Sequence, residues 1–126
     1  MATWQDVRHC ATALPEVVEG TSYGRPAWSV RKSTFAWERP LGRKDLADLG
    51  LVAQAGPVLG VRVADEGVAR ALVASSAACF TIPHFRGFPA VLVDLDDVAP
   101  DELQELVQEA WLCRAPARLV AGFLAR

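Results

Sequence analysis

The sequence has few of the residues that usually hold metals, redox centres and cofactors. It contains three cysteines and two histidines in 126 residues, and no two cysteines have the short spacing of a zinc or thiol redox motif. The glycines form neither the dinucleotide fingerprint nor a phosphate-binding loop, and no serine stands in the Gly-x-Ser-x-Gly elbow of a hydrolase. We therefore expect a protein with no metal site, no cofactor and no catalytic residue, that is, not an enzyme.

Long apolar runs and a secretory signal are missing as well. No stretch approaches the roughly 20 apolar residues of a membrane span, and residues 1–6 lack the positive and apolar regions of a signal peptide. We expect a cytoplasmic protein without a membrane partner. The length of 126 residues, with 52% hydrophobic and 22% charged residues, predicts one globular domain over residues 1–126.

The spacing of apolar residues predicts an α+β domain. Helical periodicity marks residues 3–14, 65–74, 100–115 and 116–123. Alternation of apolar and polar residues predicts a β-hairpin over residues 25–39. Shorter apolar runs predict strands at 58–63, 79–82 and 90–95, and the last of these is apolar enough to be a central strand. Residues 40–56 form a long connector with one helical turn near residues 45–49. This order predicts an antiparallel β-sheet with helices packed on one face.

Two predictions concern which side chains face the interior. With a two-residue loop at Lys32-Ser33, Trp28 lies opposite Trp37, and the four large apolar groups of the hairpin share one face as cross-strand pairs. The helix over residues 65–74 is expected to turn Val68, Ala71 and Leu72 inward. The helix beginning at Pro100 has a regular apolar stripe, formed by Leu103, Leu106, Val107, Ala110 and Trp111.

The charge is unevenly distributed along the chain. The formal net charge is −2, but residues 25–44 hold six basic residues against Glu38 alone, and residues 94–109 hold seven acidic residues and no basic one. The basic segment 25–44 can present a basic surface to a polyanion such as DNA. Alternatively, both charged runs can be ordinary solvated faces. The candidate nucleic-acid-binding residues are Arg25, Arg31, Lys32, Arg39, Arg43 and Lys44.

A second group of residues suggests a pocket for a small molecule. Aromatic rings accept flat ligands by stacking, and a histidine beside an arginine in the loop at residues 83–89 can bind an anion. The alternative for the same residues is core packing and the satisfaction of loop carbonyls. The candidate ligand-binding residues are Tyr23, Trp28, Trp37, His84, Phe85 and Arg86.

Four segments in this order resemble the MmcQ/YjbR family. They are residues 19–28 (Glu-Gly-Thr-Ser-Tyr-Gly-Arg-Pro-Ala-Trp), 34–37 (Thr-Phe-Ala-Trp), 81–93 with the Pro-His-Phe-Arg-Gly-Phe-Pro loop, and 102–116 with its Ala-Trp and Ala-Pro pairs. The resemblance implies a CyaY-like fold with a double-wing arrangement, and it implies DNA binding, because the family is generally described in that way. A family namesake in an antibiotic biosynthesis cluster also implies a small-molecule-binding or self-protection role.

Three hypotheses therefore follow from the sequence. The first is weak, nonspecific and salt-dependent DNA binding through the basic hairpin and connector. The second is a pocket between sheet and loops for an aromatic small molecule. The third is a homodimer in place of a monomer, formed through apolar surface on the hairpin or the last helix.

Overall fold

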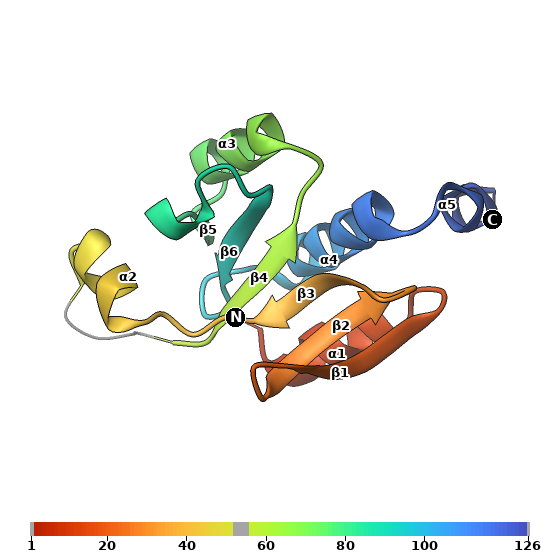
Figure 1. Ribbon diagram of the computed structural model, residues 1–126, viewed down its shortest axis with the longest axis horizontal. Helices are drawn as coiled ribbons and strands as arrows, with labels where there is room; N and C mark the ends of the chain where they lie inside the picture. The colour runs from red at the N-terminus through yellow and green to blue at the C-terminus, as the bar shows by residue number, and fades with distance from the viewer. Residues whose placement is uncertain (1, 52–55, 126) are drawn as a thin grey trace.

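The computed structural model describes residues 2–51 and 56–125, which form one antiparallel sheet and its helices (Figure 1). In the described part of the chain, six strands lie in the order β1-β2-β3-β4-β6-β5. The strand predicted to be central is β6, which lies between β4 and β5. The strands are β1 (Val17–Ser22), β2 (Arg25–Val30), β3 (Ser33–Glu38), β4 (Val58–Arg62), β5 (Cys79–Phe80) and β6 (Ala90–Asp94).

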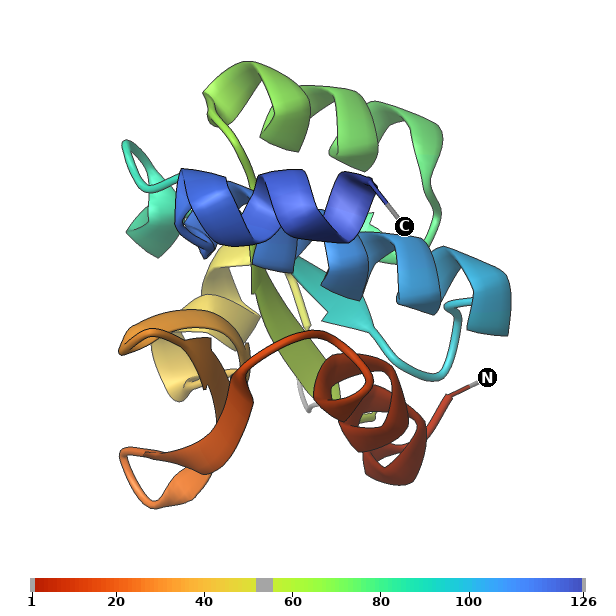
Figure 2. The same ribbon diagram turned by 90° about the vertical axis from the view of Figure 1, so that its right-hand side faces the viewer.

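The helices lie mainly on one face of the sheet, which confirms the predicted α+β class. In Figure 2, α3, α4 and α1 follow one another from top to bottom beside the sheet. The short helix α2 and the last helix α5 stand at opposite ends of the molecule (Figure 1). The helices are α1 (Trp4–Thr12), α2 (Arg43–Asp48), α3 (Glu66–Ser75), α4 (Pro100–Arg114) and α5 (Ala117–Leu124), with a 3-10 turn η1 (Pro83–Phe85).

Local sequence explains where the two main helices begin. At the start of α1, the Thr3 hydroxyl accepts a hydrogen bond from the Asp6 amide (3.3 Å), and the Asp6 carboxylate accepts one from the Thr3 amide (2.9 Å). Helix α4 has Pro100 at its first position, followed by two acidic residues that favour the positive end of the helix dipole. Both starts agree with the prediction.

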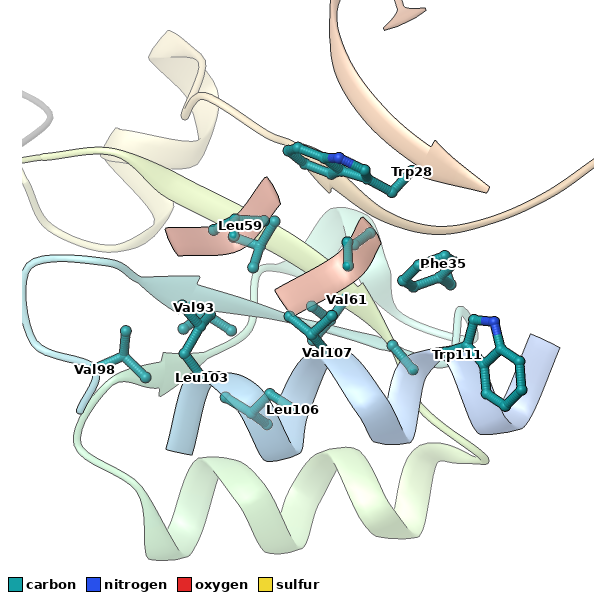
Figure 3. Close-up of a cluster of buried hydrophobic side chains, with 14 of the residues drawn as sticks. Trp28, Phe35, Leu59, Val61, Val93, Val98, Leu103, Leu106, Val107 and Trp111 are labelled. Carbon is teal, nitrogen blue, oxygen red and sulfur yellow. The ribbon is translucent and has the colours of Figure 1, made fainter. Parts of the chain in front are cut away.

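The main core lies between the sheet and the helices α1 and α4 (Figure 3). All five residues of the predicted α4 stripe are buried there, where α4 packs against β3, β4 and α1. Two buried indoles have their N–H groups satisfied: Trp28 donates to Glu19 (2.9 Å), and Trp111 donates to the Pro15 carbonyl (3.1 Å). No helix in the described ranges is long and apolar enough to cross a bilayer.

The turn between β2 and β3 differs from the prediction by one residue. Its two-residue loop is Arg31-Lys32, and Val30 pairs with Ser33. Both loop residues have a positive φ, 48° for Arg31 and 68° for Lys32, as a type I′ turn requires. The sequence does not distinguish the two positions, because neither Arg31-Lys32 nor the predicted Lys32-Ser33 contains the Gly or Asn that usually adopts this conformation.

A β-bulge in β3 changes the face to which Trp37 belongs. Between two successive pairs, β2 advances by one residue and β3 by two, so β3 holds one extra residue, Phe35. Phe35 and Ala36 are consequently both buried in the main core, and Trp37 faces the other side of the sheet. The prediction that Trp37 shares a face with Trp28 is wrong, because strict alternation does not hold across a bulge.

Two further elements differ from the prediction, and a third agrees with it. Strand β1 was not predicted, because it is an exposed edge strand without apolar alternation. In α3, Val68 and Ala71 are exposed, while Ala69 and Leu72 pack against the core, because the helix lies beside the short edge strand β5 and buries only a narrow stripe. The connector contains α2 as predicted, and its residues 52–55 lie outside the described residues.

Candidate functional site

A cavity of about 460 Å³ opens on the sheet face opposite α1 and α4. It lies between the β1–β2 turn, the ends of β3 and β4, and η1. This volume is within the range of small-molecule sites. The cavity is lined by Ser22, Tyr23, Arg25, Thr34, Trp37, Glu38, Arg39, Pro40, Arg62, His84, Phe85 and Phe88.

Three aromatic rings form one wall of the cavity. The ring centroids of Trp37 lie 6.3 Å from those of Phe85 and of Phe88, and the two phenylalanine rings are 5.6 Å apart at 68°, an edge-to-face contact. Trp37 can occupy this position because its pairing partner on the neighbouring strand β4 is Gly60. A Cβ at Gly60 would lie 2.5 Å from the indole ring, so any side chain there would displace it.

The loop around η1 holds the two phenylalanines in place. Pro83 fits the first position of the 3-10 turn, and the Phe85 amide donates to the Ile82 carbonyl (3.0 Å). The Phe88 amide then donates to the Phe85 carbonyl (2.8 Å), across Gly87, whose φ of 80° suits glycine. As a result Phe85 is buried in the smaller core, while Phe88 stays 40% exposed beside the cavity.

Three guanidinium groups line the cavity, and two of them are paired with carboxylates. Arg25 donates to Glu38 at 2.6 Å, and Arg39 donates to Asp45 at 3.1 Å. Asp45 also accepts from the Gly42 amide (2.8 Å), so this buried carboxylate joins the end of β3 to α2. Arg62, the third guanidinium of the cavity, has no such pair with a described carboxylate.

Arg62 lies at the end of β4 with its guanidinium carbon 4.6 Å from the centre of the Phe88 ring. Its Nε donates to the Pro89 carbonyl (3.2 Å). Among the described residues, no carboxylate lies within ion-pair distance of it. Burial lowers the pKa of the Arg62 guanidinium, and the positive charge of Arg114 lowers it further.

The structure brings together four of the six residues predicted to bind a small molecule: Tyr23, Trp37, His84 and Phe85 all line the cavity. Trp28 is not part of it, because its ring is 1% exposed within the main core (Figure 3). Arg86 lines a separate groove of about 290 Å³ between α3 and η1. The bulge in β3 explains why Trp28 is excluded, since it places Trp28 and Trp37 on opposite faces of the sheet.

The six basic residues predicted to bind nucleic acid fall into three groups. Arg31 and Lys32 form the β2–β3 turn, and the six-residue strands separate this turn from Arg25 at the far end of β2 by roughly 20 Å. Arg25 and Arg39 form the second group, since both line the cavity, and Arg43 and Lys44 form the third group on α2. Four of the six have ion pairs with carboxylates: Arg25 with Glu38, Arg31 with Glu16, Arg39 with Asp45 and Lys44 with Asp48.

Sequence reasoning missed Arg62, which lies in the site together with Glu38. One signal was present, a single charged residue at the end of the apolar run at residues 58–63. Its neighbours in the structure, Phe88 and Pro89, are more than 25 positions further along the chain. Only the pairing of β4 with β6 brings them together.

These features define a class of protein: a small α+β domain with an open antiparallel sheet, helices on one face and a ligand-sized cavity on the other. The chain belongs to the YjbR family, whose family model matches residues 12–113.

Full-length relatives occur in mycobacteria. The uncharacterized proteins Rv2570 of Mycobacterium tuberculosis and Mb2600 of Mycobacterium bovis are each 45% identical to this chain, over 99% of it and 98% of their own length. Among solved structures, Deinococcus radiodurans protein DR2400, a DUF419 protein, matches with a TM-score of 0.57 and 20% identity. That match covers 89% of this chain and 78% of DR2400. It shows a shared fold.

Proposed function

We propose that this protein binds a small molecule with a flat apolar body in the cavity beside Trp37. The observation that carries the proposal is the aromatic wall of Trp37, Phe85 and Phe88 on a concave surface. Ligand sites combine such apolar walls with a few polar groups that orient the ligand. Here those polar groups come from the ends of three strands and from the loop around η1.

Two exposed aromatic side chains support the proposal. Tyr23 is fully exposed at the tip of the β1–β2 turn, where its φ is 53°, and Phe88 is 40% exposed. Leaving aromatic surface in water is unfavourable, and a ligand between these rings would cover part of it. The turn that holds Tyr23 thus forms one rim of the cavity and the loop with Phe88 forms the other.

We propose binding without catalysis. In the described structure, the Thr34 hydroxyl at the cavity is hydrogen-bonded to Ser29 at 3.1 Å. No hydrogen bond between described residues joins His84 to Ser22 or to Thr34. A nucleophile and its base need that contact.

Intrinsic fluorescence tests the proposal, because Trp37 differs from the other tryptophans in its surroundings. Trp28 and Trp111 are buried in the main core and Trp4 stacks on Trp28 at 6.5 Å. Naphthalene and indole derivatives should change the fluorescence of the wild type and raise its Tm. Trp37→Phe should lose the fluorescence response, and the matched control Trp4→Phe should keep it. The proposal fails if no probe binds at millimolar concentration, or if Trp37→Phe responds like the wild type.

Weak nucleic-acid binding is a second proposal, supported by Lys32 and Arg43. Both side chains are exposed, and neither has an ion pair within the described ranges. Phosphate contacts from such residues are weak and sensitive to salt. In a gel-shift assay at low salt, Lys32→Ala with Arg43→Ala should weaken DNA binding more than the control Arg31→Ala with Lys44→Ala, whose residues already have carboxylate partners. No shift of the wild type at micromolar protein would exclude this function.

A further inference from the structure

We propose that the ligand carries an anionic group, a carboxylate or a phosphate, beside its flat apolar body, and that Arg62 binds this group. The inference rests on the proposed function, since it names the ligand class of the same cavity. It is drawn from the charges around the cavity, whereas the proposed function is drawn from its aromatic wall. The two can therefore fail separately.

The position of Arg62 is fixed by contacts that leave its terminal amines available. Its Nε is used by the Pro89 carbonyl, and the planar group lies over the face of Phe88. No hydrogen bond from the two terminal nitrogens to a described residue is present. A guanidinium held in this way offers paired N–H donors, which suit the two oxygens of a carboxylate or phosphate. The same contact with Phe88 brings the anion next to the aromatic wall.

The other charges of the cavity do not compete for the anion. Arg25 and Arg39 already have carboxylate partners. Arg62 also borders a groove between α3 and α4 lined by Glu102, Glu105 and Glu109, but none of these three lies within ion-pair distance of it in the described structure. Arg62 is thus the one cavity guanidinium that has no carboxylate partner in the part of the chain that the structure describes.

Arg114 increases the positive potential at this point. It is the last residue of α4, its charge acts on Arg62, and its buried Nε has no hydrogen-bond partner among the described residues. Two neighbouring cations that are partly removed from water are unfavourable without a counter-charge. A bound anion supplies that counter-charge, and this gain adds to the burial of its apolar body.

Glu38 provides a test with the opposite sign. Its carboxylate lines the cavity and neutralises Arg25. Glu38→Gln removes a negative charge that repels an anion and releases Arg25 as a second donor. The variant should therefore bind anions more tightly than the wild type. A misfolded variant could not produce that result.

The experiment compares 2-naphthoate, 2-naphthyl phosphate and the neutral 2-naphthamide by fluorescence titration and by the shift in Tm. We expect the wild type to bind at least one anion about tenfold or more tightly than the amide. Arg62→Gln should abolish this preference while its affinity for the amide stays within about threefold. Arg86→Gln, in the neighbouring groove, should keep the preference, and Glu38→Gln should increase it. The tighter of the two anions identifies the group as carboxylate or phosphate.

The outcomes separate the two proposals. If none of the three naphthyl compounds binds, the proposed function fails. If the wild type binds the amide as tightly as both anions, or if Arg62→Gln keeps the preference for anions, the ligand class is wrong while the cavity still binds a small molecule. Weaker anion binding by Glu38→Gln would also contradict the inference.

Discussion

Gly60 determines at the residue scale whether Trp37 can occupy the cavity wall. Gly60→Ala places a Cβ 2.5–2.9 Å from three atoms of the indole ring, so the ring must move. We expect the free energy of unfolding to fall by about 1–3 kcal/mol and the fluorescence of Trp37 to change. Urea denaturation measures the first effect. The control is Gly20→Ala in β1, where a Cβ meets nothing within 4 Å, and its stability should stay the same or rise slightly.

Glu19 makes stability depend on pH. Its carboxylate accepts hydrogen bonds from Arg8 (2.8 Å) and from the buried Trp28 indole (2.9 Å). The bond from Arg8 is the main cause that holds the pKa of Glu19 below its ordinary value of 4.5. The stabilisation is therefore complete above that ordinary value and is lost as the pH falls through the lowered pKa of the folded state.

The corresponding experiment compares wild type and Glu19→Gln by chemical denaturation at pH 7 and at pH 3. The variant should be less stable at pH 7, and the difference should shrink toward pH 3, because below the ordinary pKa of 4.5 the unfolded state takes up a proton more readily than the folded state, in which the pKa of Glu19 is lowered. Glu105→Gln is the control, because Glu105 is exposed on α4 without an ion pair to a described residue. A difference that is the same at both pH values would contradict the assignment.

At the scale of elements, the β2–β3 hairpin is closed by a turn whose residues do not suit its backbone. Lys32 has a φ of 68°, a conformation that favours glycine. Lys32→Gly should raise the free energy of unfolding by about 0.5–1 kcal/mol, as measured by urea denaturation. Lys32→Ala removes the same charge but keeps the strain, so it should give no such gain. Equal effects of the two variants would show that charge, and not backbone, governs the turn.

The elements that sequence could predict are those whose signals are local. The start of the first helix and the apolar stripe of α4 depend on residues three to eight positions apart, and both were predicted correctly. The register of the hairpin was wrong, because the turn residues Arg31 and Lys32 include no Gly or Asn and the bulge at Phe35 has no local signal in the sequence. For the same reason about half of the site was missed: the partners of Arg62 come from a distant strand and its loop.

At the scale of the whole molecule, most basic residues of the run 25–44 form local ion pairs, and their carboxylate partners come from outside the acidic run 94–109. Most of these pairs are exposed on at least one side, so each contributes little to stability. We expect the free energy of unfolding to change by less than about 1 kcal/mol between 50 and 500 mM NaCl, as measured by urea denaturation at both salt concentrations. A loss of several kcal/mol would contradict this expectation, because it would mean that the exposed ion pairs contribute substantially to stability.

The bulge in β3 determines which residues of this strand face the cavity. The single additional residue at Phe35 puts Trp37 on the ligand face and Ala36 in the main core. If β2 and β3 paired without the bulge, the same residues would alternate strictly, and the indole would turn toward α4, where the core is already filled. The aromatic wall would then lose its largest ring although the sequence of β3 had not changed. In this protein, a slip in the pairing of β2 with β3 is therefore a change of ligand surface as well as a change of register.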